Sequence, residues 1–310
     1  MSHIPKNDYQ NKTRIDKITK GVFFIITLFC ASIIFFIVLF IFIRGIKPFI
    51  NTYQVGDSFY RVNFWQFMTG TLWFQAPNIY GIGFIIVNTL YVVGLSAVIA
   101  VPISILTALF VSRIAPKIIG KVITAVIELL AAIPSIIYGL FGMGVITNFV
   151  KNMAKLVHYQ SAGGLSTFAT IIVLAIMIIP TITMISITSI KAVKKDVIDA
   201  SLALGASPTQ TNFKVVLKGA QGGIFSGIIL GVGRALGEAT AVSMIAGNSG
   251  SGPTFNLFDT TRTLTSTMLL GLKETTGLDY DIRFSVGIIL MGLILGVNFL
   301  LNLVKRRLSK

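Results

Sequence analysis

Six long apolar segments, separated by shorter polar stretches, organise this 310-residue chain. They cover residues 21–43, 82–111, 118–140, 165–190, 222–247 and 284–304. At a rise of about 1.5 Å per residue, each segment is long enough to cross a hydrocarbon core of about 30 Å as a helix. The pattern therefore predicts an all-α, polytopic membrane protein with six transmembrane helices.

The composition supports this interpretation, because 54% of the residues are hydrophobic and only 12% are charged, whereas about a quarter are charged in a typical soluble domain. The first segment resembles a signal peptide in position. It is longer than a typical signal core, and no small-residue cleavage site stands at its end, so we expect a retained anchor. Pro102 and Pro180 predict kinks in the second and fourth segments, and Pro134 predicts an early end of the third.

The net charge of +15 is distributed unevenly along the chain. If both termini are cytoplasmic, 17 of the 26 Lys and Arg residues lie on the cytoplasmic side and 8 on the external side. This asymmetry follows the positive-inside rule. The excess of positive charge therefore indicates the orientation of the chain in the membrane and not a nucleic-acid partner. The predicted organisation is a cytoplasmic tail (1–20), an anchor helix (21–43), an external loop (44–80), a five-helix core (81–304) and a cytoplasmic tail (305–310).

Several kinds of chemistry find no support in the sequence. Cys30 is the single cysteine, and His3 and His158 fall on opposite sides of the predicted membrane, so no His/Cys metal site is expected. No phosphate-binding loop ending in Gly-Lys-Ser/Thr occurs, and no nucleophile stands with a matching base in a soluble segment. We therefore expect no cofactor, no metal and no enzymatic activity in this chain.

The predicted external loop is rich in aromatic residues. They are Phe49, Tyr53, Phe59, Tyr60, Phe64, Trp65, Phe67, Trp73, Phe74 and Tyr80. Two interpretations are open: a belt of aromatic side chains at the membrane interface, or a docking surface for an external partner.

The longest predicted cytoplasmic loop, residues 191–221, contains signals for two short helices. Apolar positions between 197 and 204 have helical spacing, and Gly205 suits the C-terminal cap of that helix. Ser207, Pro208 and Gln210 then form a capping box that starts a second helix. Two interpretations are open: a rigid pair of helices that contacts another protein, or an interfacial helix on anionic lipid, assisted by Lys191, Lys194 and Lys195.

Three charged residues are predicted within the depth of the membrane. Arg234 and Glu238 lie about 18 and 24 Å along the fifth segment, and Glu128 lies about 15 Å along the third. An uncompensated charge at the centre of the membrane costs at least about 2.5–3.5 kcal/mol. With a spacing of four, Arg234 and Glu238 would share one helix face, either as a structural ion pair or as part of an anion path. Glu238 would then moderate the affinity of Arg234 for the anion.

Three motifs resemble a known family. The stretch DASLALGAS (199–207) is similar to the EAA loop of ABC importer permeases. Both ELLAAIPSIIYGLFG (128–142) and GRALGEATAV (233–242) resemble the PstC-type permease subunit of the high-affinity phosphate importer. The resemblance covers roughly residues 81–304. The chain departs from the family at Asp199, where Glu is usual, and at Lys218, where Pro is common.

The resemblance implies a type I ABC importer permease fold and a location in the bacterial inner membrane. It also implies three protein partners: a homologous second permease (PstA-type), an ATP-binding subunit dimer (PstB-type) and an external phosphate-binding protein (PstS-type). Asp199, Ala200, Ser201 and Gly205 would couple the permease to the ATPase. Arg234, Glu238 and Glu128 would line the phosphate path.

Two alternatives are open. The chain could transport another oxyanion, or it could be a secondary anion transporter that uses Glu128, Arg234 and Glu238 as a proton relay.

Overall fold

The structure, a computed structural model, describes residues 6–55, 58–76 and 78–308. Residues 1–5 of the predicted basic tail, including His3, and residues 309–310 lie outside these ranges. The α-helices are α1 Lys6–Ile50, α2 Phe64–Thr69, α3 Gly83–Leu109, α4 Lys117–Ala132, α5 Ser135–Phe141, α6 Thr147–Leu156, α7 Thr167–Lys191, α8 Lys195–Ala203, α9 Pro208–Gln210, α10 Leu217–Gly237, α11 Thr240–Ile245, α12 Leu264–Leu269 and α13 Gly277–Leu308. Three π-helical stretches occupy Phe110–Ile114, Gly142–Ile146 and Thr211–Val216. Two small antiparallel hairpins pair β1 (Tyr53–Val55) with β2 (Ser58–Tyr60) and β3 (Trp73–Phe74) with β4 (Ile79–Tyr80).

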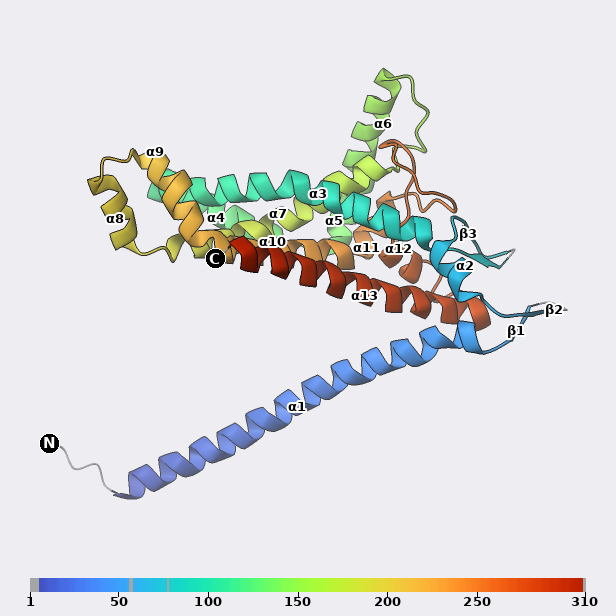
Figure 1. Cartoon of the computed structure of the whole chain (residues 1–310), viewed down its shortest axis with the longest axis horizontal. Coiled ribbons are helices and arrows are strands. Elements are labelled where there is room, and N and C mark those ends of the chain that lie inside the picture. The colour runs from blue at the N-terminus through green and yellow to red at the C-terminus, as the bar shows by residue number, and fades with distance from the viewer. Residues whose placement is uncertain (1–5, 56–57, 77, 309–310) are drawn as a thin grey trace.

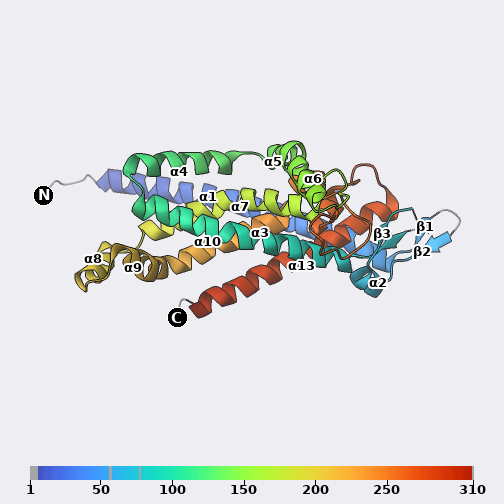
Figure 2. The same ribbon diagram turned by 90° about the horizontal axis from the view of Figure 1, so that it is seen from above.

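Helices α3, α7, α10 and α13 form a bundle along the longest axis of the molecule, and α1 runs at an angle to it (Figure 1). Helices α8 and α9 lie at one end of this bundle, and the four strands lie at the other; we call these the α8 end and the strand end. Helix α1 begins, and α13 finishes, toward the α8 end in both views (Figure 2). The beginning of the first helix and the end of the last therefore lie on the same side as the loop between α7 and α10.

Five helices among the described residues are long and apolar enough to cross a membrane. A bent pair, Lys117–Ala132 with Ser135–Leu156, makes a sixth span if it is counted as one. The all-α membrane fold is thus confirmed. The third span ends early, as Pro134 predicts, and the chain turns by 96° there. Helices α3 and α7 continue through Pro102 and Pro180, and the kinks or tilts expected there stay predictions.

The prediction of one continuous helix over residues 222–247 was wrong. Helix α10 ends at Gly237, the backbone is extended at Glu238 with ψ of 112°, and α11 starts at Thr240. No proline marks this interruption, so the apolar pattern continues across it without a local signal. Packing partners, described below, replace the helical hydrogen bonds that are lost there.

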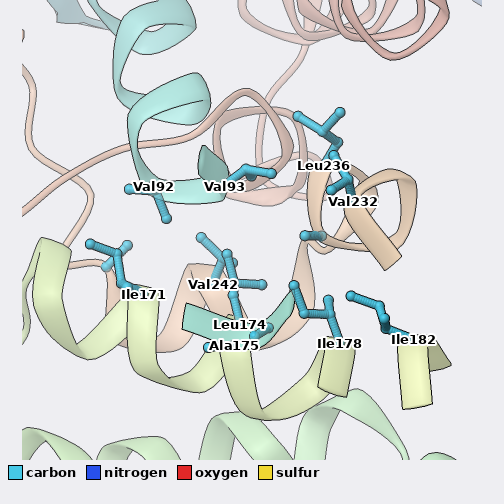
Figure 3. Packing of buried hydrophobic residues seen from close by; sticks show 13 residues of the cluster. Val92, Val93, Ile171, Leu174, Ala175, Ile178, Ile182, Val232, Leu236 and Val242 are labelled. Atoms are coloured by element: carbon cyan, nitrogen blue, oxygen red, sulfur yellow. The ribbon is translucent and has the colours of Figure 1, made fainter. Parts of the chain in front are cut away.

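The main core lies where α3, α7, α10 and α11 meet. Figure 3 shows side chains from these helices converging, with Val92 from α3, Leu174 from α7 and Val232 from α10 among them. Val242 of α11 reaches the same cluster, so the short helix after the interruption is part of the core. This packing sets the position of the interruption relative to α7.

Helix α1 joins the bundle through α13 near the strand end. Gly45 permits a close approach, because an added Cβ would lie 2.7 Å from the backbone of Phe284. The Ser285 hydroxyl donates to the Gly45 carbonyl at 2.6 Å, and Arg44 forms an ion pair with Asp281 at 3.2 Å. Most apolar side chains of α1 before this contact are exposed, as expected for a helix that faces lipid.

The aromatic loop after α1 has a small core of its own. Phe67, Trp73 and Tyr80 are almost completely buried, in a cluster that also contains Leu278 and Ile282 of α13. Others from the same loop, such as Phe59 and Trp65, stay exposed. The aromatic residues therefore divide into a structural set and a surface set, a division that neither sequence interpretation anticipated.

Candidate functional site

The interruption between α10 and α11 carries the predicted intramembrane charges. Arg234 lies three residues before the end of α10 and is half-buried. Its Nη1 donates to the Thr181 hydroxyl of α7 at 3.1 Å. Among the described residues, no carboxylate lies within 4.0 Å of the Arg234 guanidinium, so none neutralises it directly. A half-buried guanidinium held by one neutral hydroxyl keeps donors free for a ligand.

Glu238 occupies the interruption itself and has different partners. Its side chain accepts a hydrogen bond from the Ala241 backbone N–H at 3.0 Å, and its carbonyl accepts one from the Thr265 hydroxyl at 2.8 Å. The prediction that Arg234 and Glu238 share one helix face was wrong, because the helix ends at Gly237. The carboxylate caps the start of α11 instead of pairing with the arginine.

Glu128, the third predicted charge, lies on the exposed side of α4. It lines a groove of about 410 Å³ together with Lys117, Lys121 and Lys191. Its side chain makes no hydrogen bond or ion pair among residues 6–55, 58–76 and 78–308. The structure therefore joins Arg234 and Glu238 at one interruption and places Glu128 in a groove with lysines.

The two interrupted spans meet through their short helices. Gly139 of α5 lies so close to α11 that an added Cβ would be 2.6 Å from the Met244 sulfur and 3.1 Å from the Ala241 Cα. Tyr138, also on α5, donates its hydroxyl hydrogen to the Leu130 carbonyl at 2.8 Å. The α5–α11 contact therefore depends on a glycine that only close packing explains.

Sequence reasoning missed α12 and Thr181. Helix α12 starts with a capping box in which Thr263 and Ser266 exchange hydrogen bonds, and it is buried between α11 and α13. From it, Thr265 reaches the carbonyl of Glu238. The run TTRTLTST (260–267) is an available signal, since so many hydroxyls beside apolar residues favour buried hydrogen bonds. Thr181 stands in an ordinary apolar helix and offers no such signal.

The loop at the α8 end forms the two capped helices that the sequence predicts. Gly205 has a φ of +86° and ends α8, and the capping box between Ser207 and Gln210 has both of its hydrogen bonds. The Ser201 hydroxyl lies 3.0 Å from that of Thr211, which ties α8 to the chain after α9. Ile198 is buried against the bundle. The pair of helices is thus fastened to the bundle.

The outer face of α8 exposes several large apolar side chains. Val197, Leu202 and Leu204 are exposed, with Leu204 at 89%. Asp199 and Ala200 are exposed as well, whereas Ser201 is half-buried. A short helix that exposes large apolar side chains next to a carboxylate is typical of a contact surface.

Comparison with known proteins gives the class of the molecule. Residues 100–310 match the family model described as "Binding-protein-dependent transport system inner membrane component". The chain belongs to this family. It is therefore a multi-pass membrane permease component, and the matched region contains both pairs of a long and a short helix and the α8–α9 loop.

Individual relatives agree with this assignment. The permease is 37% identical over 249 residues to the "Probable ABC transporter permease protein YqgH" of Bacillus subtilis, covering 79% of this chain and 77% of that protein. It is 33% identical over 251 residues to the "Phosphate transport system permease protein PstC" of Pasteurella multocida, covering 76% and 77%. A PstC protein of Haemophilus influenzae is 31% identical over 239 residues, covering 73% and 76%.

Solved structures confirm the fold. The permease matches a chain of a bacterial alginate ABC transporter with a TM-score of 0.62, covering 96% of this chain and 99% of the other at 19% identity. It also matches a chain of the MetNI methionine ABC transporter with a TM-score of 0.57, covering 76% and 100%. Both confirm an ABC importer permease fold. Among the described residues, no group of three or more His, Cys, Asp or Glu side chains is placed to hold a metal ion.

Proposed function

We propose that this permease forms half of the path for inorganic phosphate in an ATP-driven importer. The similarity to phosphate transport permeases supports the choice of substrate. The observation that carries the proposal is Arg234, a half-buried guanidinium without a carboxylate partner at an interrupted helix. Its planar fork matches phosphate oxygens, and the Thr181 hydroxyl orients it.

In this proposal Glu238 acts mainly on the shape of the site. By capping α11 it holds the chain open beside Arg234, and its negative charge limits how tightly an anion is retained. Glu128 adds a charge to the lysine-lined groove near the α8 end. The path would run between this chain and a homologous PstA-type permease, because one partly exposed arginine cannot enclose an anion alone.

The other partners follow from the two ends of the molecule. The α8 end would face the cytoplasm and a PstB-type ATPase dimer, with Asp199, Ala200, Ser201 and Gly205 at the contact. The strand end would face outward, toward a PstS-type phosphate-binding protein. Both termini would then be cytoplasmic, in a bacterial inner membrane. A permease for another oxyanion stays an alternative that the substrate assay below decides.

The proton-relay alternative has less support. Glu238 is engaged by a backbone N–H and Glu128 by no described group, and no hydrogen bond connects either carboxylate to Arg234. Phosphate uptake by proteoliposomes that hold this chain alone, driven by a proton gradient without ATP, would favour the relay.

The decisive experiment changes Arg234. In the complete importer, Arg234→Gln should reduce ATP-dependent uptake of radiolabelled phosphate by at least about tenfold while assembly is unchanged, because Gln retains a donor but loses the charge and the fork. The double variant with Glu238→Gln removes both charges and should assemble and still fail. Near-normal uptake by a well-expressed double variant would contradict the role of Arg234, and uptake of sulfate instead of phosphate would contradict the substrate.

Coupling is tested separately at Gly205. With a φ of +86° and no atom within 4 Å of an added Cβ, Gly205→Val strains only the backbone turn after α8. We expect the variant to insert normally but to lose substrate-stimulated ATP hydrolysis and co-purification with the ATPase. Gly144→Val, also without a neighbour within 4 Å, is the control outside this loop. Unchanged coupling in Gly205→Val would show that α8 is not the contact.

A further inference from the structure

Two arginines meet in a pocket at the strand end, away from the interruption that holds Arg234. Arg262 precedes α12, and Arg283 lies in the second turn of α13. They line a pocket of about 370 Å³. Its other lining residues are Trp73, Phe74, Gln75, Leu270, Gly271 and Glu274. Nothing in the proposed phosphate path uses these residues.

Both guanidinium groups are oriented by backbone carbonyls. Arg262 donates from Nε to the Ser249 carbonyl and from Nη2 to the Asn248 carbonyl, each at 2.8 Å. Arg283 donates from Nη1 to the Thr267 carbonyl at 2.7 Å. Carbonyls fix the direction of a guanidinium but do not neutralise its charge. In the part of the chain that the structure describes, neither arginine has a carboxylate within 4.0 Å.

The burial of these charges is costly, because no carboxylate forms an ion pair with either guanidinium. Arg283 is only 2% exposed, and its Nε is buried without a hydrogen-bond partner. Burial, and secondarily the charge of Arg283, lower the pKa of Arg262 to about 10, so the Arg262 guanidinium is charged at neutral pH. Two guanidinium groups that line one pocket and form no ion pair favour an anion between them.

The backbone leaves room for the second guanidinium. Gly271 has a φ of +74°, and an added Cβ there would lie 2.7 Å from Nη2 of Arg283. Any other residue at this position would push the guanidinium away from the wall of the pocket. The glycine therefore permits Arg283 to reach the pocket in spite of its burial.

Two carboxylates near the arginines narrow the class of anion. Asp279 accepts a hydrogen bond from the Tyr80 hydroxyl, so part of its capacity is used. Glu274 is exposed and lines the pocket itself, without an ion pair. A carboxylate repels a fully deprotonated anion but accepts a hydrogen bond from a protonated one. Inorganic phosphate keeps at least one proton at neutral pH, and sulfate keeps none.

We propose that this pocket binds a protonated oxyanion, with hydrogen phosphate as its type, at the strand end of the permease. Arg262 and Arg283 contact the anionic oxygens, and Glu274 accepts the hydrogen bond of the protonated oxygen. The site does not depend on the proposed path through the membrane. It is a second anion site that holds the ion before or after passage.

The pocket contains its own reporter for a binding test. The chain has two tryptophans, and Trp73 lines the pocket while Trp65 is 73% exposed. In the full chain with Trp65→Phe, reconstituted in lipid nanodiscs, titration with inorganic phosphate should give a saturable change in Trp73 fluorescence. Sulfate should require a concentration at least about tenfold higher, since Glu274 opposes it. The response should persist with Arg234→Gln, which separates this site from the path.

Three variants decide the matter. Arg262→Gln should weaken phosphate binding by about tenfold or more, and Glu274→Gln should bring the phosphate and sulfate affinities close together. Lys273→Gln removes an exposed neighbouring charge that does not line the pocket, and should change the affinity by less than about twofold. If phosphate gives no saturable response, or if Arg262→Gln and Lys273→Gln behave alike, the proposal is wrong. A Glu274→Gln variant that still prefers phosphate would overturn the role of Glu274.

Discussion

The two interrupted spans of this permease reach the same result by different means. Each consists of a long helix and a short helix that starts after two intervening residues: α4 with α5, and α10 with α11. At the first interruption Pro134 lacks an N–H, and the Tyr138 hydroxyl satisfies the carbonyl of Leu130 only eight residues away. The first interruption therefore results from residues that are close together in the sequence.

The second interruption depends on distant residues. No proline is present, and the carbonyl of Glu238 is satisfied by Thr265, which lies 27 residues further along the chain. The α7 helix contributes Thr181, 53 residues before Arg234. The comparison shows that a helix break without a proline can be stabilised by a hydrogen bond from a distant residue. It also predicts that the two interruptions differ in their response to mutation.

The contact between the two short helices should give the largest effect. Gly139→Leu places atoms where Met244 and Ala241 already lie, and we expect it to lower the free energy of unfolding by about 3 kcal/mol and to stop uptake. Gly144→Leu, which meets nothing within 4 Å, is the matched control. Thermal unfolding in detergent compares the two. Equal stability would mean that α5 and α11 do not need close packing.

Removal of the Thr265 hydroxyl, the distant hydrogen-bond donor at the second interruption, should have the next largest effect on the free energy of unfolding. Thr265→Val leaves the carbonyl of Glu238 without its hydrogen bond in a buried site, which costs about 2 kcal/mol. Thr188→Val removes an exposed hydroxyl whose hydrogen bond lies within its own helix, and should be nearly neutral. The same unfolding measurement applies. A neutral Thr265→Val would place the cause of the second break in its local sequence.

Loss of the local hydrogen bond at the first interruption should lower the stability less. Tyr138→Phe removes one hydroxyl and leaves the ring in place, so we expect a loss of about 1 kcal/mol. Pro134 still excludes a continuous helix in this variant. A loss larger than that of Thr265→Val would reverse the comparison between the two interruptions.

The smallest effect is expected at the side chain of Glu238. Glu238→Gln keeps an oxygen for the Ala241 N–H and should change stability by less than about 0.5 kcal/mol, whereas Glu238→Ala loses the cap at a cost of about 1 kcal/mol. Unfolding of both variants at neutral pH measures the difference. If Gln and Ala are equally destabilising, the charge of Glu238 matters more than its hydrogen bond.

Much of the fold could be predicted from local patterns. Apolar segments of membrane length predicted the spanning helices, Pro134 predicted the first interruption, and Gly205 with the Ser207–Gln210 capping box predicted the helices at the α8 end. These signals work because they act within a few residues: a missing N–H, a positive φ, or a side chain that reaches its own helix start.

Their partners were decided by the tertiary structure. Sequence spacing placed Arg234 and Glu238 on one helix face, but Thr265 and Ala241 offer Glu238 hydrogen bonds that a continuous helix would not use. In the same way, the pocket of Arg262 and Arg283 joins a loop to the start of α13. A buried polar group takes the partner that the packed chain brings within reach, and that partner is set by the whole fold instead of by neighbouring residues.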